Sequence, residues 1–146
     1  MFEINNSIFI KRPLQDVFNI ITDPTKQSIW QNLAESAEWT TNGSTGVGST
    51  MKVAARFLGR KIESVFEVTA WEPPNRVDYK YVDGPYPVEV TNTLEPQGEG
   101  TLLSSLSQGE MGSFFKLAEG LVARQLKKQL ATNYESLKLM MESGQL

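Results

Sequence analysis

Hydrophobic and polar residues alternate along the first eleven positions of the chain. The apolar residues occupy even positions, namely Phe2, Ile4, Ile8 and Ile10. Polar residues fill most of the odd positions, although Phe9 is apolar there and Asn6 is polar among the even ones. A period of two residues predicts a β-strand with one buried face.

Two short helices are predicted after this strand. Pro13 suits the first turn of a helix because its fixed φ and missing N–H cost nothing there, and apolar residues follow it at helical spacing. Asp23-Pro24 ends the first helix, since the residue before a proline is pushed out of the α region. Residues 25–32 predict a second short helix that turns Ile29 and Trp30 inward.

The middle of the chain contains short alternating segments separated by turn residues. Strands are predicted over residues 35–40, 50–57, 62–70, 76–81, 88–94 and 101–107. Glycine-rich or proline-containing stretches separate them, of which residues 41–48 are the longest. Short strands with a turn about every ten residues indicate an antiparallel meander.

The last segment changes to a helical period. From Ser113 to about Met141, apolar residues recur in steps of three and four, which predicts one helix with a single apolar stripe. At 1.5 Å per residue the helix would be ~43 Å long, and its stripe, including Leu126, Leu130 and Leu137, needs a long apolar cover. Only the sheet can supply it. The pattern therefore predicts one α+β domain over residues 1–146, in which a curved antiparallel sheet of six to seven strands wraps the C-terminal helix.

Composition and charge exclude several classes of function. The net charge is −3, whereas a nucleic-acid-binding domain normally presents a basic patch. The absence of cysteine excludes thiol chemistry, and the absence of histidine removes the usual zinc and copper ligand sets and any histidine-dependent triad. No apolar run approaches the ~20 residues of a membrane helix, and the first segment lacks the apolar core of a secretory signal. We expect a cytoplasmic protein with no metal, cofactor, nucleic-acid partner or membrane insertion.

Several motifs resemble those of a known superfamily. They are Pro13-Leu14-Gln15-Asp16-Val17-Phe18, Ile21-Thr22-Asp23-Pro24, Trp30, Gly46-Val47-Gly48-Ser49, the stretch from Phe66 to Arg76, Gly100-Thr101 and Tyr134-Glu135-Ser136-Leu137-Lys138. With the order of elements, they resemble the polyketide cyclase/dehydrase-like branch of the START-like (SRPBCC) superfamily over nearly the whole chain. The resemblance implies the helix-grip fold. It does not single out a function, because lipid and hormone carriers, aromatase/cyclases, quinone-binding proteins and co-chaperone domains share that fold.

An apolar cavity is expected between the sheet and the start of the long helix, where it would bind a small hydrophobic molecule for transport or sequestration. The predicted lining residues are Trp30, Val53, Phe57, Phe66, Tyr79, Tyr81, Val90, Phe114, Phe115 and Leu121. The alternative for each of them is ordinary core packing. The two tyrosines combine a large ring with a hydroxyl group that can orient a ligand carbonyl or phenol.

Catalysis, as in a cyclase or dehydratase, is an alternative function. The strands offer carboxylates as acids or bases, at Glu63, Glu67, Glu89 and Glu95. Their alternation with apolar neighbours places them on the solvent face. The candidates for proton transfer are Tyr79, Tyr81 and Glu67, and because they form no recognisable constellation, no catalytic residue is assigned. Asn6, Ser64 and Asn92 share a face with apolar residues instead, which indicates either a polar cavity wall or a hydrogen-bonded core.

Protein interaction, as in co-chaperones, is the other alternative. It requires an exposed apolar patch, and the candidates are Phe9, Tyr86 between two prolines, and the helix end Leu139-Met140-Met141. Scattered apolar residues of this kind are normal on any protein surface. We therefore expect a monomer or weak homodimer.

Overall fold

The computed structural model describes residues 2–57, 59–110 and 119–146. In chain order its elements are β1 (Phe2–Ile10), α1 (Leu14–Ile21), the 3₁₀ turn η1 (Pro24–Lys26), α2 (Gln27–Trp30), β2 (Ala34–Trp39), β3 (Thr50–Phe57), β4 (Arg60–Glu72), β5 (Arg76–Asp83), β6 (Val88–Gln97), β7 (Gly100–Gly109) and α3 (Glu119–Glu142). The predicted order of strands and helices is confirmed. Residues 113–118, the predicted beginning of the long helix, lie outside the described residues.

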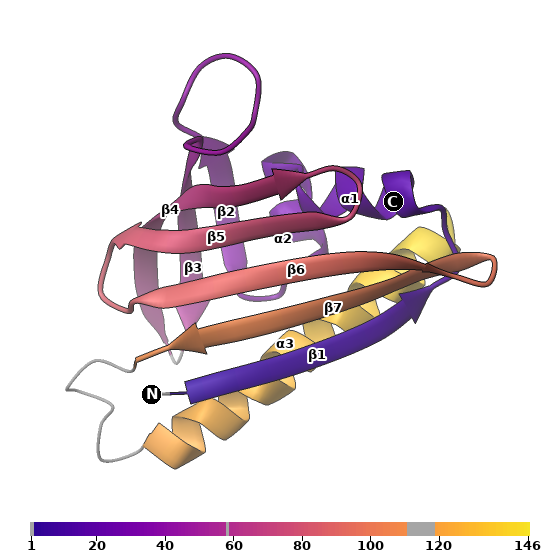
Figure 1. Ribbon diagram of the computed structural model, residues 1–146. Helices are drawn as coiled ribbons and strands as arrows, with labels where there is room; N and C mark the ends of the chain where they lie inside the picture. Colours follow the sequence, from indigo (N-terminus) through magenta and orange to yellow (C-terminus); the bar gives the residue numbers. More distant parts are fainter. Residues whose placement is uncertain (1, 58, 111–118) are drawn as a thin grey trace.

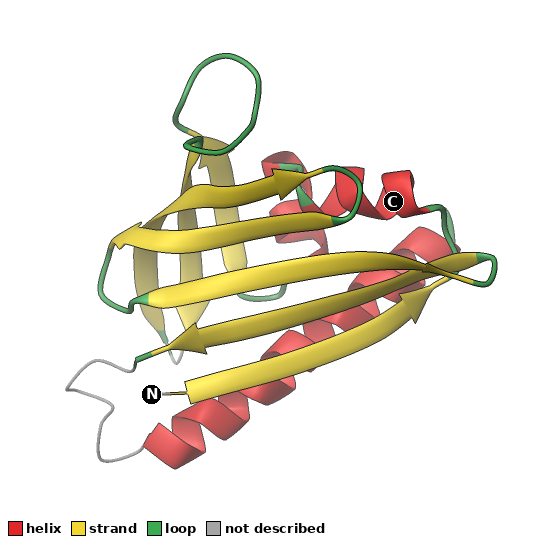
Figure 2. Cartoon of the chain, viewed as in Figure 1, coloured by secondary structure: helices red, strands yellow, loops and turns green. Residues whose placement is uncertain are grey.

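The seven strands form one antiparallel sheet in the order β1-β7-β6-β5-β4-β3-β2. Strands β2 to β7 form the predicted meander, and β1 pairs with the remaining edge of β7, with Phe2 opposite Gly109 and Ile10 opposite Thr101. The sheet is strongly curled, and α3 runs along its concave side (Figure 1). Figure 2 shows that the short helices lie on the same side, near the C-terminus of the chain. The predicted α+β class and helix-grip fold are confirmed.

The C-terminal half of α3 is attached to the junction between β1 and α1. Nη1 of Arg12 donates to the Met141 carbonyl at 2.8 Å, and the backbone N–H of Lys11 donates to the Glu142 carboxylate at 2.9 Å. Nζ of Lys138 donates to the Phe9 carbonyl at 2.6 Å. The hydrogen bond from Arg12 gives a partner to the Met141 carbonyl, which has none within the helix. Together the three contacts fix the end of α3 beside the edge strand β1.

The hydrophobic core occupies the same end of the concave face. Its fully buried members come from the sheet, α1 and α3, and include Ile10, Val17, Val77, Leu94, Leu103, Leu137 and Met141. Leu137 faces the sheet as predicted and has no exposed surface. Leu126 and Leu130 also turn toward the sheet, but they are only half-buried. The apolar stripe of α3 is therefore fully buried near the C-terminal end of the helix and only half-buried at Leu126 and Leu130.

Three leucines of α3 test this placement. Leu137→Ala should lower the free energy of unfolding by about 2–5 kcal/mol because it leaves a cavity in a packed core. Leu130→Ala should cost less, since the space beside Leu130 is already unfilled, and Leu139→Ala should have almost no effect at a side chain that is 61% exposed. Chemical denaturation measures all three. Equal losses for Leu137 and Leu139 would contradict the orientation of the helix.

Candidate ligand-binding site

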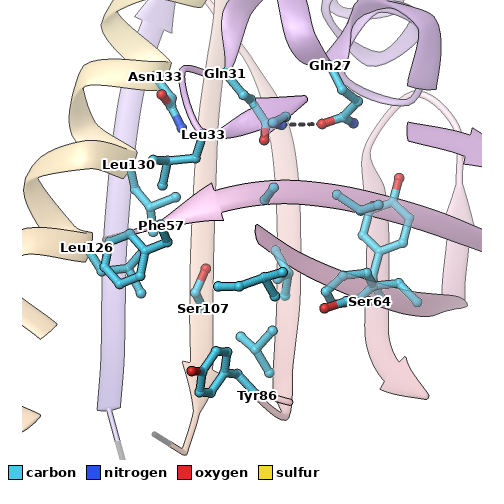
Figure 3. A pocket seen from close by; sticks show the side chains of 18 of the residues that line it. Gln27, Gln31, Leu33, Phe57, Ser64, Tyr86, Ser107, Leu126, Leu130 and Asn133 are labelled. Carbon is cyan, nitrogen blue, oxygen red and sulfur yellow. Dashed lines mark hydrogen bonds between the residues drawn. The ribbon is translucent and has the colours of Figure 1, made fainter. Parts of the chain in front are cut away.

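A cavity of about 340 Å³ lies between the concave face of the sheet and α3. All seven strands contribute to its wall, together with the end of α1, α2 and α3. Figure 3 shows side chains from the helices and strands converging on this space. Most of them are aliphatic or aromatic, so the wall is mainly apolar.

The cavity exists because α3 approaches the sheet along one side only. Its backbone lies closest to β1 and α2 and farther from the central strands. Across the gap the strands present small side chains, including Ala55, Ser64 and Ser107. Leu126 reaches in from α3, and Figure 3 shows Phe57 beside it. The side chains of Ala55, Ser64 and Ser107 are too short to fill the space between the sheet and α3.

The strand register shows which end of the cavity is closed. Along β7, Ser107 lines the cavity, whereas Leu103, four residues away on the same face, belongs to the core. The same change occurs along β6 between Asn92 and Leu94. The closed end therefore adjoins the core, and the opposite end extends toward the exposed Glu110.

Most of the predicted lining residues that the structure describes are in the cavity wall. They are Trp30, Val53, Phe57, Phe66, Tyr79 and Val90. Phe114 and Phe115 lie outside the described residues. That these side chains contact a ligand remains a prediction.

Two of the predicted lining positions need correction. Leu121 is 67% exposed and does not line the cavity, so that prediction is wrong. Its neighbour Val122 lines the cavity instead, because one residue along a helix turns the side chain by about 100°. Tyr81 is half-buried and is not in the wall. It lies beyond Lys80, the last residue of β5 that pairs with β6.

Sequence reasoning missed the polar helix residues at the closed end. Gln27 of α2, Gln31 directly after α2 and Asn133 of α3 line the cavity, and Nε2 of Gln31 donates to Oε1 of Gln27 (Figure 3). Oδ1 of Asn133 accepts the backbone N–H of Asn32 at 3.0 Å. Asn133 is 2% exposed. Asn133 could have been predicted as a buried polar residue, because it follows Leu130 by three residues and so falls within the apolar stripe of the helix.

Two polar atoms in residues of the wall are buried without a hydrogen-bond partner among the described residues. They are the indole N–H of Trp30 and the hydroxyl group of Tyr79. Each such group costs about 1–3 kcal/mol relative to a paired one. Burial also raises the pKa of Tyr79 and of Tyr134, whose hydrogen bond with Ser105 opposes part of that rise. Tyr79 therefore remains a neutral phenol at physiological pH.

The cavity wall is almost free of charge. Among its described residues only Glu110 carries a carboxylate, and its side chain is exposed at the rim. Glu67 pairs with Lys80 across neighbouring strands at 3.1 Å and does not line the cavity. The solvent-facing positions predicted for the other strand carboxylates are confirmed, since all three are exposed: Glu63, Glu89 and Glu95. Ser64 and Asn92, left open between cavity and core, line the cavity.

The sequence matches the family described as polyketide cyclase / dehydrase and lipid transport over residues 1–142. The chain belongs to this family. A search of curated protein sequences found no match. Family membership agrees with the resemblance of the sequence motifs and with the cavity between sheet and helix.

Solved structures share the fold of this polyketide cyclase / dehydrase and lipid transport family member. The protein TTHA0849 from Thermus thermophilus superimposes with a TM-score of 0.85 at 20% identity, over 98% of this chain and 99% of that one. A START superfamily protein from Mycobacterium smegmatis gives a TM-score of 0.70 at 16% identity, over 92% and 98% of the two chains. The Aha1 dimer from Colwellia psychrerythraea gives 0.66 at 21% identity, over 96% of both chains. At these identities the likeness concerns the fold alone.

Membrane-spanning and metal-binding features are absent from the described part of this family member. Across residues 2–57, 59–110 and 119–146, no helix has the length and hydrophobicity to span a bilayer. Within the same ranges, no group of three or more candidate side chains comes together to hold a metal ion. The polar groups along the described cavity wall are mainly amides, hydroxyl groups and one indole.

The buried tyrosines predict how stability depends on alkaline pH. Because burial raises the folded-state pKa of Tyr79 and Tyr134, their contribution to stability is complete below the unfolded-state pKa of about 10 and is lost as the pH rises above it. Tyr79→Phe should make unfolding less dependent on pH in that range. Tyrosinate absorbance and circular dichroism, followed together, measure this. Ionisation of every tyrosine in a protein that keeps its folded spectrum would contradict the burial.

Proposed function

We propose that this protein binds a small, mainly apolar molecule in the cavity between the sheet and α3, and carries or sequesters it. The observation that supports the proposal is an apolar cavity of about 340 Å³ that adjoins a packed core. Ligand-binding cavities occupy about 300–1,000 Å³, whereas packed interiors contain few voids larger than a water molecule. The family description, which includes lipid transport, supports the same class of function.

The arrangement of the core also supports binding. The packed end of the molecule, with Leu137 at its centre and the contacts of Arg12 and Lys138 around the helix end, stabilises α3 without filling the cavity. The residues that line an empty cavity lack van der Waals contacts on the side that faces the cavity, and this lowers the stability of the folded protein. A bound apolar molecule would supply those contacts, and a ligand that binds only the folded state raises its stability.

The family description also names cyclases and dehydrases, which require proton transfer. Tyr79 and Tyr134 are tyrosines of the wall whose burial raises the pKa of the hydroxyl group, so both remain protonated at neutral pH. Among the described residues, the one carboxylate of the wall is Glu110 at the exposed rim. General acid–base chemistry works best with a pKa near the working pH. These features favour binding over catalysis.

The candidate apolar surfaces offer little for a protein partner. Phe9 is covered by Lys138, whose Nζ lies 5.5 Å from the ring centre, and Tyr86 lines the cavity. At the helix end Met141 is buried and Leu139 is exposed. We therefore propose a monomer or weak homodimer. Light scattering over a concentration series should give the mass of one or two chains of 16.3 kDa, and a larger stable assembly would contradict the proposal.

Binding is tested with the uncharged fluorescent dye N-phenyl-1-naphthylamine. The dye should bind with enhanced fluorescence, and Val53→Phe, which places a larger side chain in the wall, should weaken binding by about tenfold or more. Val82→Phe is the matched control, because Val82 lies on β5 and is 51% exposed. Equal affinity of the two variants would place the dye outside the cavity, and no binding to the wild-type protein would reject the proposal.

A further inference from the structure

We infer that Asn42 is a site of spontaneous covalent modification, at which the side-chain amide is lost through a cyclic imide formed with the backbone nitrogen of Gly43. The site lies in the loop between β2 and β3, which contributes no residue to the cavity wall. The modification is therefore independent of the proposed binding function. Three features favour the reaction there: the exposure of the loop, the lack of hydrogen bonds at its tip, and the glycine that follows Asn42.

The tip of this loop is open to solvent. Asn42 and Gly43 are exposed, and residues 42–45 form no hydrogen bond with any other described residue. The loop is anchored farther along the chain, where the backbone N–H of Gly48 donates to the Val68 carbonyl at 2.9 Å. Figure 1 shows the loop extending beyond the ends of the neighbouring strands. The backbone N–H of Gly43 is thus free to lose its proton and act as a nucleophile.

Gly43 removes the main steric obstacle to ring closure. The reacting nitrogen must come within about 3–3.5 Å of Cγ of Asn42, and a side chain on the following residue crowds this approach. Glycine has no Cβ and takes up φ values that other residues rarely adopt, and φ of Gly43 is +92°. Apart from its chain neighbours, no residue has an atom within 4 Å of the position that a Cβ would occupy. The surrounding protein therefore leaves room for the backbone to change conformation.

The other asparagines of the chain lie in settings that oppose the same reaction. None of them precedes a glycine. Asn92 is on the internal strand β6, which pairs on both sides, and Asn133 is within α3. Asn75 is in the turn between β4 and β5, where its backbone N–H and its side-chain amide both donate hydrogen bonds. Asn42 is thus the asparagine at which sequence and structure both favour cyclisation.

The reaction needs only water and hydroxide. Hydroxide takes the proton from the Gly43 nitrogen, which attacks Cγ of Asn42, so that the N–Cγ bond forms and the Cγ–Nδ2 bond breaks. Nδ2 takes up a proton and leaves as ammonia. Water then opens the imide at Cγ to give aspartate, or at the main-chain carbonyl carbon to give isoaspartate. Either product adds one carboxylate to a chain whose net charge is −3.

Ageing of the folded protein at mildly alkaline pH tests the inference. Ion-exchange chromatography should resolve a growing acidic form, and peptide mapping by mass spectrometry should locate aspartate and isoaspartate at Asn42. Because the loop tip is free, the rate at Asn42 should differ by less than about threefold between the folded protein and the chain unfolded in guanidinium chloride. Asn92 should react at least about tenfold more slowly in the folded protein. Comparable folding protection of Asn42, or earlier modification of another asparagine, would overturn the inference.

Substitutions in the loop assign the reaction to this pair of residues. Gly43→Ala places a methyl group on the attacking residue and should slow the modification by about tenfold or more, which corresponds to ~1.4 kcal/mol in the barrier. Asn42→Gln would require a larger ring and should remove the acidic form. Gly46→Ala is the matched control in the same loop, where a Cβ also meets no other residue, and it should keep the wild-type rate. A wild-type rate in Gly43→Ala, or an undiminished acidic form in Asn42→Gln, would contradict the assignment.

Discussion

The attachment of one end of α3 to the edge of the sheet is the constraint on which the rest of the structure depends. Arg12, Lys138 and the backbone of Lys11 hold the last turns of the helix against the β1–α1 junction. Leu137 and Met141 complete the packed core at the same place. Toward its other end, α3 lines the cavity with Val122, Leu126 and Leu130, none of which belongs to the packed core cluster.

The polar residues of the concave face lie beside the cavity rather than in the packed core. At the packed end the strands contribute leucine and valine, which fill the space under the helix. Toward the cavity the same faces of β6 and β7 carry Asn92, Ser105 and Ser107. A longer hydrophobic residue in place of Asn92 or Ser107, which line the cavity, would reduce its volume. Small uncharged residues that form hydrogen bonds leave the cavity open. Charged side chains at these positions would be strongly unfavourable, because an enclosed apolar space does not solvate them.

Much of the fold could be predicted from local pattern. The period of two in the strands, the change to a helical period and the proline at the start of α1 each act over a few residues, so their consequences are visible without the tertiary structure. The cavity wall was predicted less completely. The strand positions Val53, Phe57, Phe66, Tyr79 and Val90 were found because alternation assigns every second residue to the concave face. Polar residues of the helices were missed, because apolar spacing was the only criterion applied to them.

The sequence by itself determined the order of elements, the buried face of each strand and the cysteine-free and histidine-free chemistry of the chain. Only the tertiary structure decided which apolar residues pack in the core and which enclose a cavity. It also decided that Val122 rather than Leu121 faces the cavity, and that Tyr79 but not Tyr81 lines it. Periodicity specifies the direction of a side chain relative to its own element. The distance to the facing element depends on contacts between residues far apart in the chain, and these are absent from any local pattern.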